Sequence, residues 1–406
     1  MLQKYRFVHF HLERRSFVLG GALLASFLLV SNAWAALTPP PSSAPTAVQL
    51  QLLAMKTTTT GWATDARLAN PAALFGGQLL HTVDGGRQWI NVTPPHVTFN
   101  EQPSPTSLPH NTVTDFLSGS TAWTVTETST SMNGTGIVLF SFTHDGGRRW
   151  HQWTVHLPHL VDKAGLFNPI LNQADFLNVR DGWLAFGPDS NIFVQGMELW
   201  RTTNGGRSWT RIDQLDGISG RSPIAAEMGT FTSADDGWMT KGATHRMPVL
   251  LHTTNGGRTW TKVALGAVPG GRPTFTGRFG VIRVRNAALT NNQIPRTTDG
   301  GHHWNGPFTI PGQFVPILRP NHRFSLPPVV QQIGGHLIWD LEGQRLWRST
   351  NGGATWNLQD TASGLSRMGG IDFINRHVGW AKEKNRLCMT TSGGRHWTSW
   401  LPVLLR

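Results

Sequence analysis

Polar turns and short apolar segments alternate along most of the chain in a repeating pattern. The turn reads Thr/Ser-x-Asp/Asn/Ser-Gly-Gly-x-x-Trp and occurs seven times, first at Thr82–Trp89 and last at Thr390–Trp397. Successive turn tryptophans lie 41 to 61 residues apart, a step that suits one four-stranded sheet with loops of variable length. The pattern therefore predicts an all-β fold, a seven-bladed β-propeller of four-stranded antiparallel blades. We call each copy of the pattern a repeat turn.

A second repeat lies upstream of most repeat turns, where an apolar residue precedes a tryptophan by seven positions. It predicts an inner strand that carries the apolar residue and a second strand that begins near the tryptophan. A third strand then runs into the repeat turn, and a fourth begins at the turn tryptophan. The stretches around Phe279–Val284 and Val329–Trp339 keep this order without the spacing. The spaced pairs are Met55 and Trp62, Phe116 and Trp123, Phe176 and Trp183, Phe231 and Trp238, and Phe373 and Trp380.

These repeats account for an unusual aromatic composition. The chain has 18 Trp, and 13 of them occupy repeat positions, where their large rings suit contact between successive blades. We therefore interpret most of the tryptophans as scaffold. The repeat turns contain Trp89, Trp150, Trp209, Trp260, Trp304, Trp356 and Trp397, and the second strands contain Trp62, Trp123, Trp183, Trp238, Trp339 and Trp380.

The first 35 residues have the order of a secretory signal peptide. A positively charged segment up to Arg15 precedes an apolar run over 16–30, and residues 33–35 read Ala-Trp-Ala, a cleavage-site pattern. The run is shorter than the roughly 20 residues that span a bilayer, and an uncleaved signal anchor is the alternative. Arg14 and Arg15 fit either a twin-arginine signal or an ordinary charged region. We expect export, a signal peptide over 1–35, a Pro-rich linker over 36–47 and the propeller over 48–406.

The repeat turns share a short side chain with an oxygen directly before the two glycines. That oxygen can accept bonds from nearby backbone N–H groups, and the glycines permit a positive φ. Four of the seven copies lack a carboxylate at this position, whereas a metal site or an acid catalyst would need one. We therefore interpret the turns as structural. The residues are Asp84, Asp145, Asn204, Asn255, Asp299, Asn351 and Ser392.

The repeat turn resembles the Asp-box, or BNR, repeat of sialidases, sortilin-type receptors, xyloglucanase-type glycosidases and photosystem II assembly factors. Its combination with a Phe strand and a Gly-Trp strand is most similar to the photosystem II assembly and stability factors, over about residues 48–403. The resemblance implies a seven-bladed propeller. It also implies a protein-interaction or assembly platform for a membrane protein, although one propeller scaffold hosts many functions.

The resemblance to sialidases does not extend to their reaction. Those enzymes use a Tyr nucleophile, and the one Tyr of the chain, Tyr5, lies in the expected signal peptide. Three carboxylates directly precede the Phe of an inner strand: Asp115, Asp175 and Asp372. Two of them near the channel could serve as the acid and base of a glycosidase. Alternatively, they are a repeat feature that bonds to loop N–H groups or faces solvent. We favour the second interpretation and expect no catalytic residues and no enzyme, with a carbohydrate-active enzyme or lectin as the alternative.

Charge is the one positive sign of a ligand. The chain carries a net charge of +12, of which +9 remains without residues 1–35, and this sign favours anionic surfaces. Arg directly follows the glycines in five repeat turns, where it could bind carboxylate or phosphate groups. It could instead stack on a nearby Trp or remain solvated. These candidate binding residues are Arg87, Arg148, Arg207, Arg258 and Arg395.

The expected partner is a membrane protein or an anionic component of the cell envelope, bound by a monomer. We expect no nucleic-acid partner, because an exported protein does not normally meet DNA. The chain has a single Cys and no His pair with ligand spacing beside a carboxylate, so we expect no metal site and no cofactor.

The two ends of the expected propeller bear on ring closure. Blade one has sequence for four strands of its own from Val48 to Val92, and blade seven from about Gly370 to Val403. We therefore expect these blades to meet by packing, without exchange of a strand. The Pro-rich stretches 93–110 and 310–328 are expected to be long loops that could carry specificity.

Overall fold

The computed structural model describes most of the expected propeller. The described residues are 50–65, 78–97, 112–130, 135–158, 169–188, 198–214, 226–227, 230–243, 246–269, 273–285, 292–311, 329–342, 345–360, 368–383, 386–400 and 404–405. The expected signal peptide and linker lie outside them, as do most of the two Pro-rich stretches, so those expectations stay predictions. No helix within the described residues is long and apolar enough to cross a membrane.

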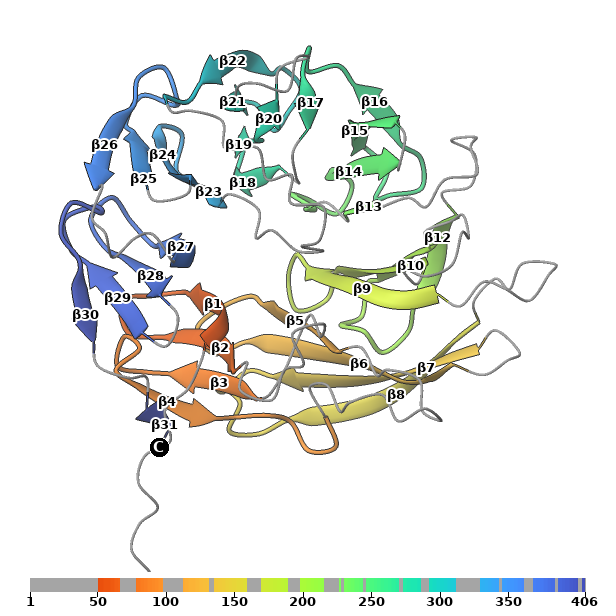
Figure 1. The fold of residues 1–406 in the computed structure, drawn as a ribbon. Coiled ribbons are helices and arrows are strands. Elements are labelled where there is room, and N and C mark those ends of the chain that lie inside the picture. Colours follow the sequence, from red (N-terminus) through yellow and green to blue (C-terminus); the bar gives the residue numbers. More distant parts are fainter. Residues whose placement is uncertain are drawn as a thin grey trace, which may run out of the picture. The chain divides into compact units, whose positions relative to one another are not determined.

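The described residues form seven antiparallel sheets, which Figure 1 shows in the order of the chain. Blade one holds β1 (Leu50–Met55), β2 (Gly61–Asp65), β3 (Leu79–Thr82) and β4 (Gln88–Asn91). Blade two holds β5 (Thr112–Phe116), β6 (Ala122–Thr130), β7 (Thr135–Thr143) and β8 (His151–Pro158). Blade three holds β9 (Pro169–Phe176), β10 (Gly182–Pro188), β11 (Glu198–Thr202) and β12 (Thr210–Gln214). Blade four holds β13 (Ala226–Glu227), β14 (Gly237–Ala243), β15 (Arg246–Thr253) and β16 (Thr261–Val263).

The remaining blades complete the predicted number. Blade five holds β17 (Val268–Pro269), β18 (Thr274–Thr276), β19 (Phe279–Val281), β20 (Val284–Arg285), β21 (Asn292–Thr297) and β22 (Asn305–Thr309). Blade six holds β23 (Val329–Ile333), β24 (Leu337–Glu342), β25 (Arg345–Ser349) and β26 (Asn357–Asp360). Blade seven holds β27 (Met368–Phe373), β28 (Gly379–Glu383), β29 (Arg386–Thr390) and β30 (Thr398–Trp400). The seven-bladed, all-β propeller predicted from the repeats is confirmed.

Blade five keeps the four-strand plan with its inner two strands broken. β18 pairs with β19 and β17 pairs with β20, and both β19 and β20 pair with β21. The break falls at Ile282 and Arg283, between β19 and β20. The seven-residue spacing is lost for another reason, because only Gly277 and Arg278 join β18 to β19, whereas residues 117–121 join β5 to β6 in blade two.

Ring closure corrects the expectation that no strand is exchanged. Blades one and seven each have four strands of their own, as expected, but β31 (Leu404–Leu405) pairs in parallel with β4 of blade one. The chain therefore returns to the outer edge of its first blade after completing the seventh. Backbone pairing adds to the packing between the two blades.

Tryptophans of the second strands pack between successive blades. All six of these side chains are fully buried. Trp123 stacks on Phe176 of the next blade with ring centroids 4.2 Å apart, and Trp183 stacks on Phe231 at 3.6 Å. The expectation that these rings form contacts between blades is confirmed. Such contacts combine a large buried area with a favourable ring geometry.

Candidate binding face

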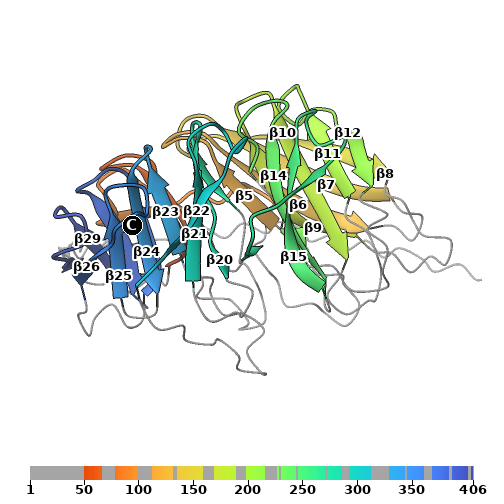
Figure 2. The same cartoon turned by 90° about the horizontal axis from the view of Figure 1, so that it is seen from above.

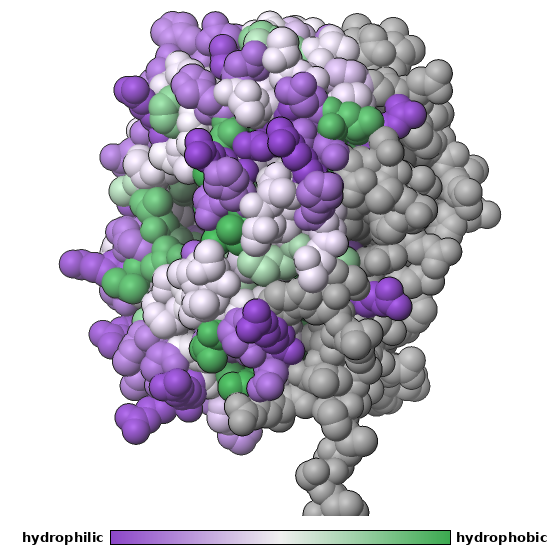
Figure 3. Space-filling model, turned by 90° about the vertical axis from the view of Figure 1, so that its left-hand side faces the viewer, coloured by the Kyte–Doolittle hydropathy of each residue, from purple (hydrophilic) through white to green (hydrophobic). Residues whose placement is uncertain are grey.

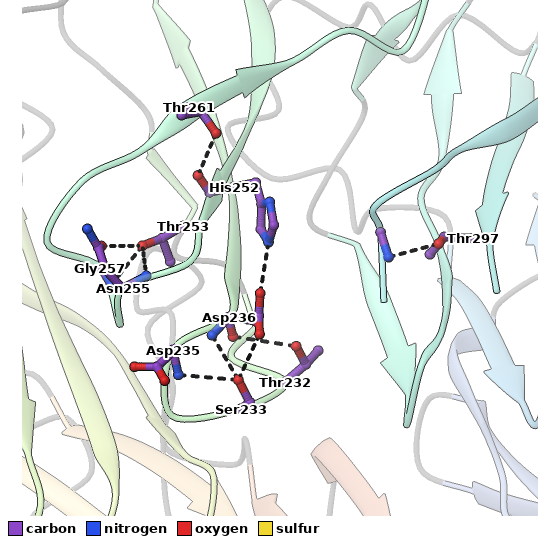
Figure 4. Close-up of polar contacts among 11 residues, drawn as sticks. Thr232, Ser233, Asp235, Asp236, His252, Thr253, Asn255, Gly257, Thr261 and Thr297 are labelled. Carbon is purple, nitrogen blue, oxygen red and sulfur yellow. Dashed lines mark hydrogen bonds and ion pairs between the residues drawn. The ribbon is translucent and has the colours of Figure 1, made fainter. Parts of the chain in front are cut away.

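Each repeat turn is held by the hydroxyl of its Thr or Ser, which bonds both to a side chain and to a backbone N–H of the same turn. In blade one, Thr82 Oγ1 donates to Asp84 Oδ1 at 2.9 Å and accepts from the Gly86 N–H at 3.0 Å. Asp84 Oδ1 also accepts from the N–H groups of Arg87 and Gln88. Figure 4 shows the same arrangement in blade four, where Thr253 Oγ1 lies beside the N–H groups of Asn255 and Gly257. Bonds among its own residues thus close the turn.

A carboxylate is not needed for this geometry. In the copies without a carboxylate, the side-chain oxygen accepts from the backbone N–H of the residue four positions later. The distance is 2.8 to 3.0 Å for Oδ1 of Asn204, Asn255 and Asn351, and 2.9 Å for Ser392 Oγ. Both glycines of every repeat turn have a positive φ, between 71° and 98°, which a residue with a Cβ would adopt only with strain. In blade two the bond from the Arg149 N–H lowers the pKa of the Asp145 carboxyl.

The repeat turns gather with a second set of turns at one end of the strands. In blade one the Gly85 N–H donates to Thr59 O at 2.8 Å, and in blade two the Gly146 N–H donates to Ser120 O at 2.9 Å. Thr59 and Ser120 belong to the turns between the first and second strands. Equivalent bonds occur in the other blades for which both turns are described, and Figure 2 shows short turns together at one end of the sheets. We call the surface formed by both sets of turns the repeat-turn face.

The five candidate arginines all lie on this face, directly after the glycines, and all are exposed: Arg87, Arg148, Arg207, Arg258 and Arg395. Arg258 Nη1 donates to Asn255 O of its own turn at 3.2 Å. Different arginines lie over aromatic rings, namely Arg201 over Trp183 and Arg348 over Trp339, each 5.4 Å from the ring centroid. The exposed positions suit binding, and the binding role of the five arginines stays a prediction.

Sequence reasoning missed two residues that directly precede the Thr of a repeat turn. Arg296, at this position in blade five, donates from Nη1 to Asn351 O of blade six at 3.2 Å. His81, its equivalent in blade one, bonds through Nε2 to Gly119 O of blade two at 2.7 Å. These side chains therefore connect neighbouring blades. Their fixed place in the repeat is a signal that could have identified them.

The three candidate catalytic carboxylates also connect blades. Asp115 Oδ2 accepts from the Phe176 N–H at 2.6 Å, and Asp175 Oδ2 accepts from the Phe231 N–H at 3.0 Å. In each case the donor is the backbone of the next blade. The interpretation as a repeat feature bonded to N–H groups therefore fits, with the correction that the donors are those of the neighbouring blade and not of a loop.

Asp372 makes the equivalent contact at the point of ring closure. Its Oδ2 accepts from the Met55 N–H of blade one at 2.5 Å, and its Oδ1 accepts from Gln331 Nε2 at 3.1 Å. Burial raises the pKa of Asp372 to about 6. Gln331, at the same position in blade six, accepts from the Phe373 N–H at 2.6 Å. An amide thus performs the same structural task as a carboxylate, which argues that the position does not require an acid.

A further acid–base pair lies in blade four, where Asp236 and His252 face each other in Figure 4. His252 Nε2 lies 3.3 Å from Asp236 Oδ1, and its ring stacks on Trp238 with centroids 3.9 Å apart. Burial lowers the pKa of His252, and the bond to Asp236 opposes this. Ser233 Oγ donates to Asp236 Oδ2 at 3.1 Å. The carboxylate therefore receives bonds from both neighbours, an arrangement that fixes the turn. Within the described residues, no group of three or more His, Cys, Asp or Glu side chains could hold a metal ion.

Known proteins resemble this chain in fold alone. No protein-family model matches the chain, and no curated protein matches its sequence. A prolyl endopeptidase is similar with a TM-score of 0.51 and 9% identity, over 87% of this chain and 50% of that one. A YCF48 structure bound to D1 peptide has a TM-score of 0.44 and 14% identity, over 86% and 92% of the two chains. An ulvan lyase of a polysaccharide lyase family has a TM-score of 0.48 and 11% identity, over 87% and 94%.

The structural neighbours thus include YCF48, a polysaccharide lyase and a prolyl endopeptidase. At these identities the likeness concerns the propeller fold alone. Proteins with many different functions share this fold. It does not distinguish a binding platform from an enzyme.

Proposed function

We propose that the chain is an exported, non-catalytic binding platform whose repeat-turn face holds an anionic region of a membrane protein or of another envelope component. The observation that carries the proposal is the exposure of five equivalent arginines on this face. Arg is suited to such a partner because its planar guanidinium can bond carboxylate or phosphate groups in a bidentate manner. Rigid turns that are closed by their own hydrogen bonds would present these groups without a large loss of conformational entropy on binding.

The three inner-strand carboxylates support a non-catalytic role. Asp115, Asp175 and Asp372 each accept a backbone N–H of the next blade. A general acid or base must reach a substrate proton, and an oxygen that joins two blades would have to give up that bond to do so. Their recurrence at one repeat position also suits a scaffold more than a single active site.

Affinity capture from the cell envelope of the source organism tests the proposal. The bait is the wild-type chain, beside a variant with Arg87→Ala, Arg148→Ala and Arg207→Ala. A control variant with Arg211→Ala and Lys262→Ala removes exposed cations from outer strands of blades three and four. We expect a membrane or envelope partner that the wild type and the control retain and the arginine variant loses.

Two results would contradict the proposal. One is recovery of the same partner, in the same amount, with the arginine variant. The other is hydrolysis of a glycan from a plant or bacterial panel that is lost in Asp115→Asn or Asp175→Asn, which would establish the carbohydrate-active alternative.

A further inference from the structure

The repeat-turn face carries its charge unevenly around the ring. The turns of blades seven, one, two and three contain eight Lys or Arg and three Asp, a net charge of +5. The turns of blades four, five and six contain two Arg and three Asp, a net charge of −1. We call the first sector the basic arc. Four of the cations in the basic arc are the candidate arginines Arg87, Arg148, Arg207 and Arg395. The other four are Lys56, Arg149, Arg180 and Arg376.

Hydrogen bonds from strand tryptophans to turns of the next blade connect the four blades of the basic arc. Trp380 Nε1 of blade seven donates to Gly85 O of blade one at 2.9 Å. Trp62 Nε1 of blade one donates to Ser118 O of blade two at 2.8 Å, and Trp153 Nε1 of blade two donates to Gly206 O of blade three at 2.8 Å. The four blades therefore present one rigid, connected surface.

The cations of the basic arc are more accessible than its acids. All eight Lys and Arg side chains are exposed, whereas Asp84, Asp145 and Asp181 are half-buried. Each of these carboxylates accepts a bond within its own turn, such as the one from Asn178 Nδ2 to Asp181 at 3.0 Å. An approaching partner would meet the cations first.

Apolar turn tips lie among these cations. Val83 is 54% exposed, Val179 52% and Leu117 36%, and they belong to turns of blades one, three and two. The other strongly exposed large apolar residues of the described chain, Ile90 and Leu358, lie on outer strands. Figure 3 views a different part of the surface, the side of the molecule at the left of Figure 1, where small apolar patches also lie between hydrophilic residues. Exposed apolar tips beside cations are characteristic of proteins that lie on membrane surfaces.

We propose that the basic arc docks onto an anionic lipid bilayer. The cations would contact lipid phosphates, while Val83, Leu117 and Val179 would enter the interface between headgroups and acyl chains. The charge alone would suit an acidic peptide equally well. The apolar tips favour a bilayer, because a bilayer offers an apolar phase beneath its whole anionic surface, whereas a peptide would have to bring an apolar residue to three successive blades. This inference rests on the proposed use of the repeat-turn face and specifies how that face would meet the envelope.

A fluorophore attached to a turn tip provides a local test. The one natural cysteine, Cys388, is buried, so Val83→Cys can be labelled selectively in the full chain with a dye sensitive to polarity. Thr254→Cys, at the same position of the repeat turn of blade four and also exposed, is the matched control outside the basic arc. Each labelled chain is titrated with phosphatidylglycerol vesicles and with phosphatidylcholine vesicles. The N-terminal apolar run is the same in every variant. Differences in vesicle binding between the variants therefore reflect the repeat-turn face.

We expect a blue shift with the anionic vesicles for the label at position 83 and little shift at position 254. Added Arg87→Ala and Arg148→Ala substitutions should weaken vesicle binding by about fivefold each, because one cation near an anionic bilayer contributes on that order. Lys262→Ala, which removes an exposed cation from the outer strand β16 of blade four, should leave it unchanged, and high salt should weaken it through screening. Melting temperatures of the variants check that these exposed substitutions leave the fold intact.

Equal shifts at both positions, or no shift with anionic vesicles, would overturn the proposal. So would tighter binding of soluble poly-glutamate than of vesicles, which would indicate an acidic polypeptide as the partner of the arc. If vesicle binding fails while the capture experiment still recovers an arginine-dependent partner, the binding platform stands and the lipid assignment is wrong.

Discussion

Replacing the carboxylate of Asp372 by an amide should stabilise the protein above neutral pH, even though that carboxylate is hydrogen-bonded. Burial raises its pKa from 3.8 to about 6, against the opposing effect of the bonds from Met55 and Gln331. The folded protein therefore binds this proton more tightly than the unfolded chain does. A difference of about two pKa units corresponds to about 3 kcal/mol.

The sign of the effect follows from the raised pKa. The stabilising contribution of the bound proton is fully present below the unfolded value of 3.8 and is lost as the pH rises through about 6. Asn is neutral at every pH and close in shape to protonated Asp. Asp372→Asn should therefore match the wild type near pH 4 and exceed its free energy of unfolding by up to about 3 kcal/mol near pH 8.

Urea unfolding followed by tryptophan fluorescence, repeated from about pH 4 to about pH 8, measures this difference. Subtracting the wild-type curve from the variant curve cancels the other titrating groups, which both proteins share. Asp235→Asn removes an exposed carboxylate of blade four and serves as the control. A free energy of unfolding that is lower in Asp372→Asn than in the wild type near pH 8 would refute the reasoning, since the bonds to blade one would then outweigh the cost of burial.

Three further predictions concern the turn, the closure and a buried histidine. Thr253→Val leaves the buried Gly257 N–H without its acceptor and should cost about 1–3 kcal/mol in urea unfolding, whereas Thr254→Val, in the same turn but exposed, should cost little. Deleting residues 404–406 removes the pairing with β4 and should lower the free energy of unfolding by about 1–2 kcal/mol; an unchanged value would mean that packing alone closes the ring. Burial lowers the pKa of His252, so folding stability should fall as the pH drops below its ordinary value of 6.5, and His252→Phe should weaken that dependence.

Local bonding explains why the blades could be predicted. The Thr or Ser of each repeat turn bonds to residues two and four positions ahead, so the whole motif lies within a short stretch of sequence. The spacing of Phe176 and Trp183 likewise reflects one inner turn between two paired strands. Patterns of this kind are visible in the sequence because each copy must satisfy the same local geometry.

Apart from the rings of the repeat tryptophans, contacts between blades could not be read from the sequence in the same way. The parallel pairing of Leu404 and Leu405 with β4 involves two apolar residues that no pattern distinguishes from their neighbours. The break between β19 and β20 falls at Ile282 and Arg283, which no pattern in the sequence marks. The partner of Asp115 depends on how two sheets pack, because its acceptor oxygen lies beside a backbone N–H of the next blade. The candidate acids were therefore identified by position, while their role required the packed structure.

Comparison of equivalent positions in the seven blades distinguishes residues that stabilise the scaffold from residues that could bind a partner. Asp175 recurs in other blades and bonds the next blade, so the stability of the ring explains its presence. Arg148 also recurs, but it is exposed, and closure of its turn uses the backbone and the side chains of Thr143 and Asp145. A structural requirement would act on all seven turns alike. It would not concentrate eight cations on blades seven, one, two and three and leave two on the other three blades. The unequal distribution is therefore better explained by a partner that meets one side of the face.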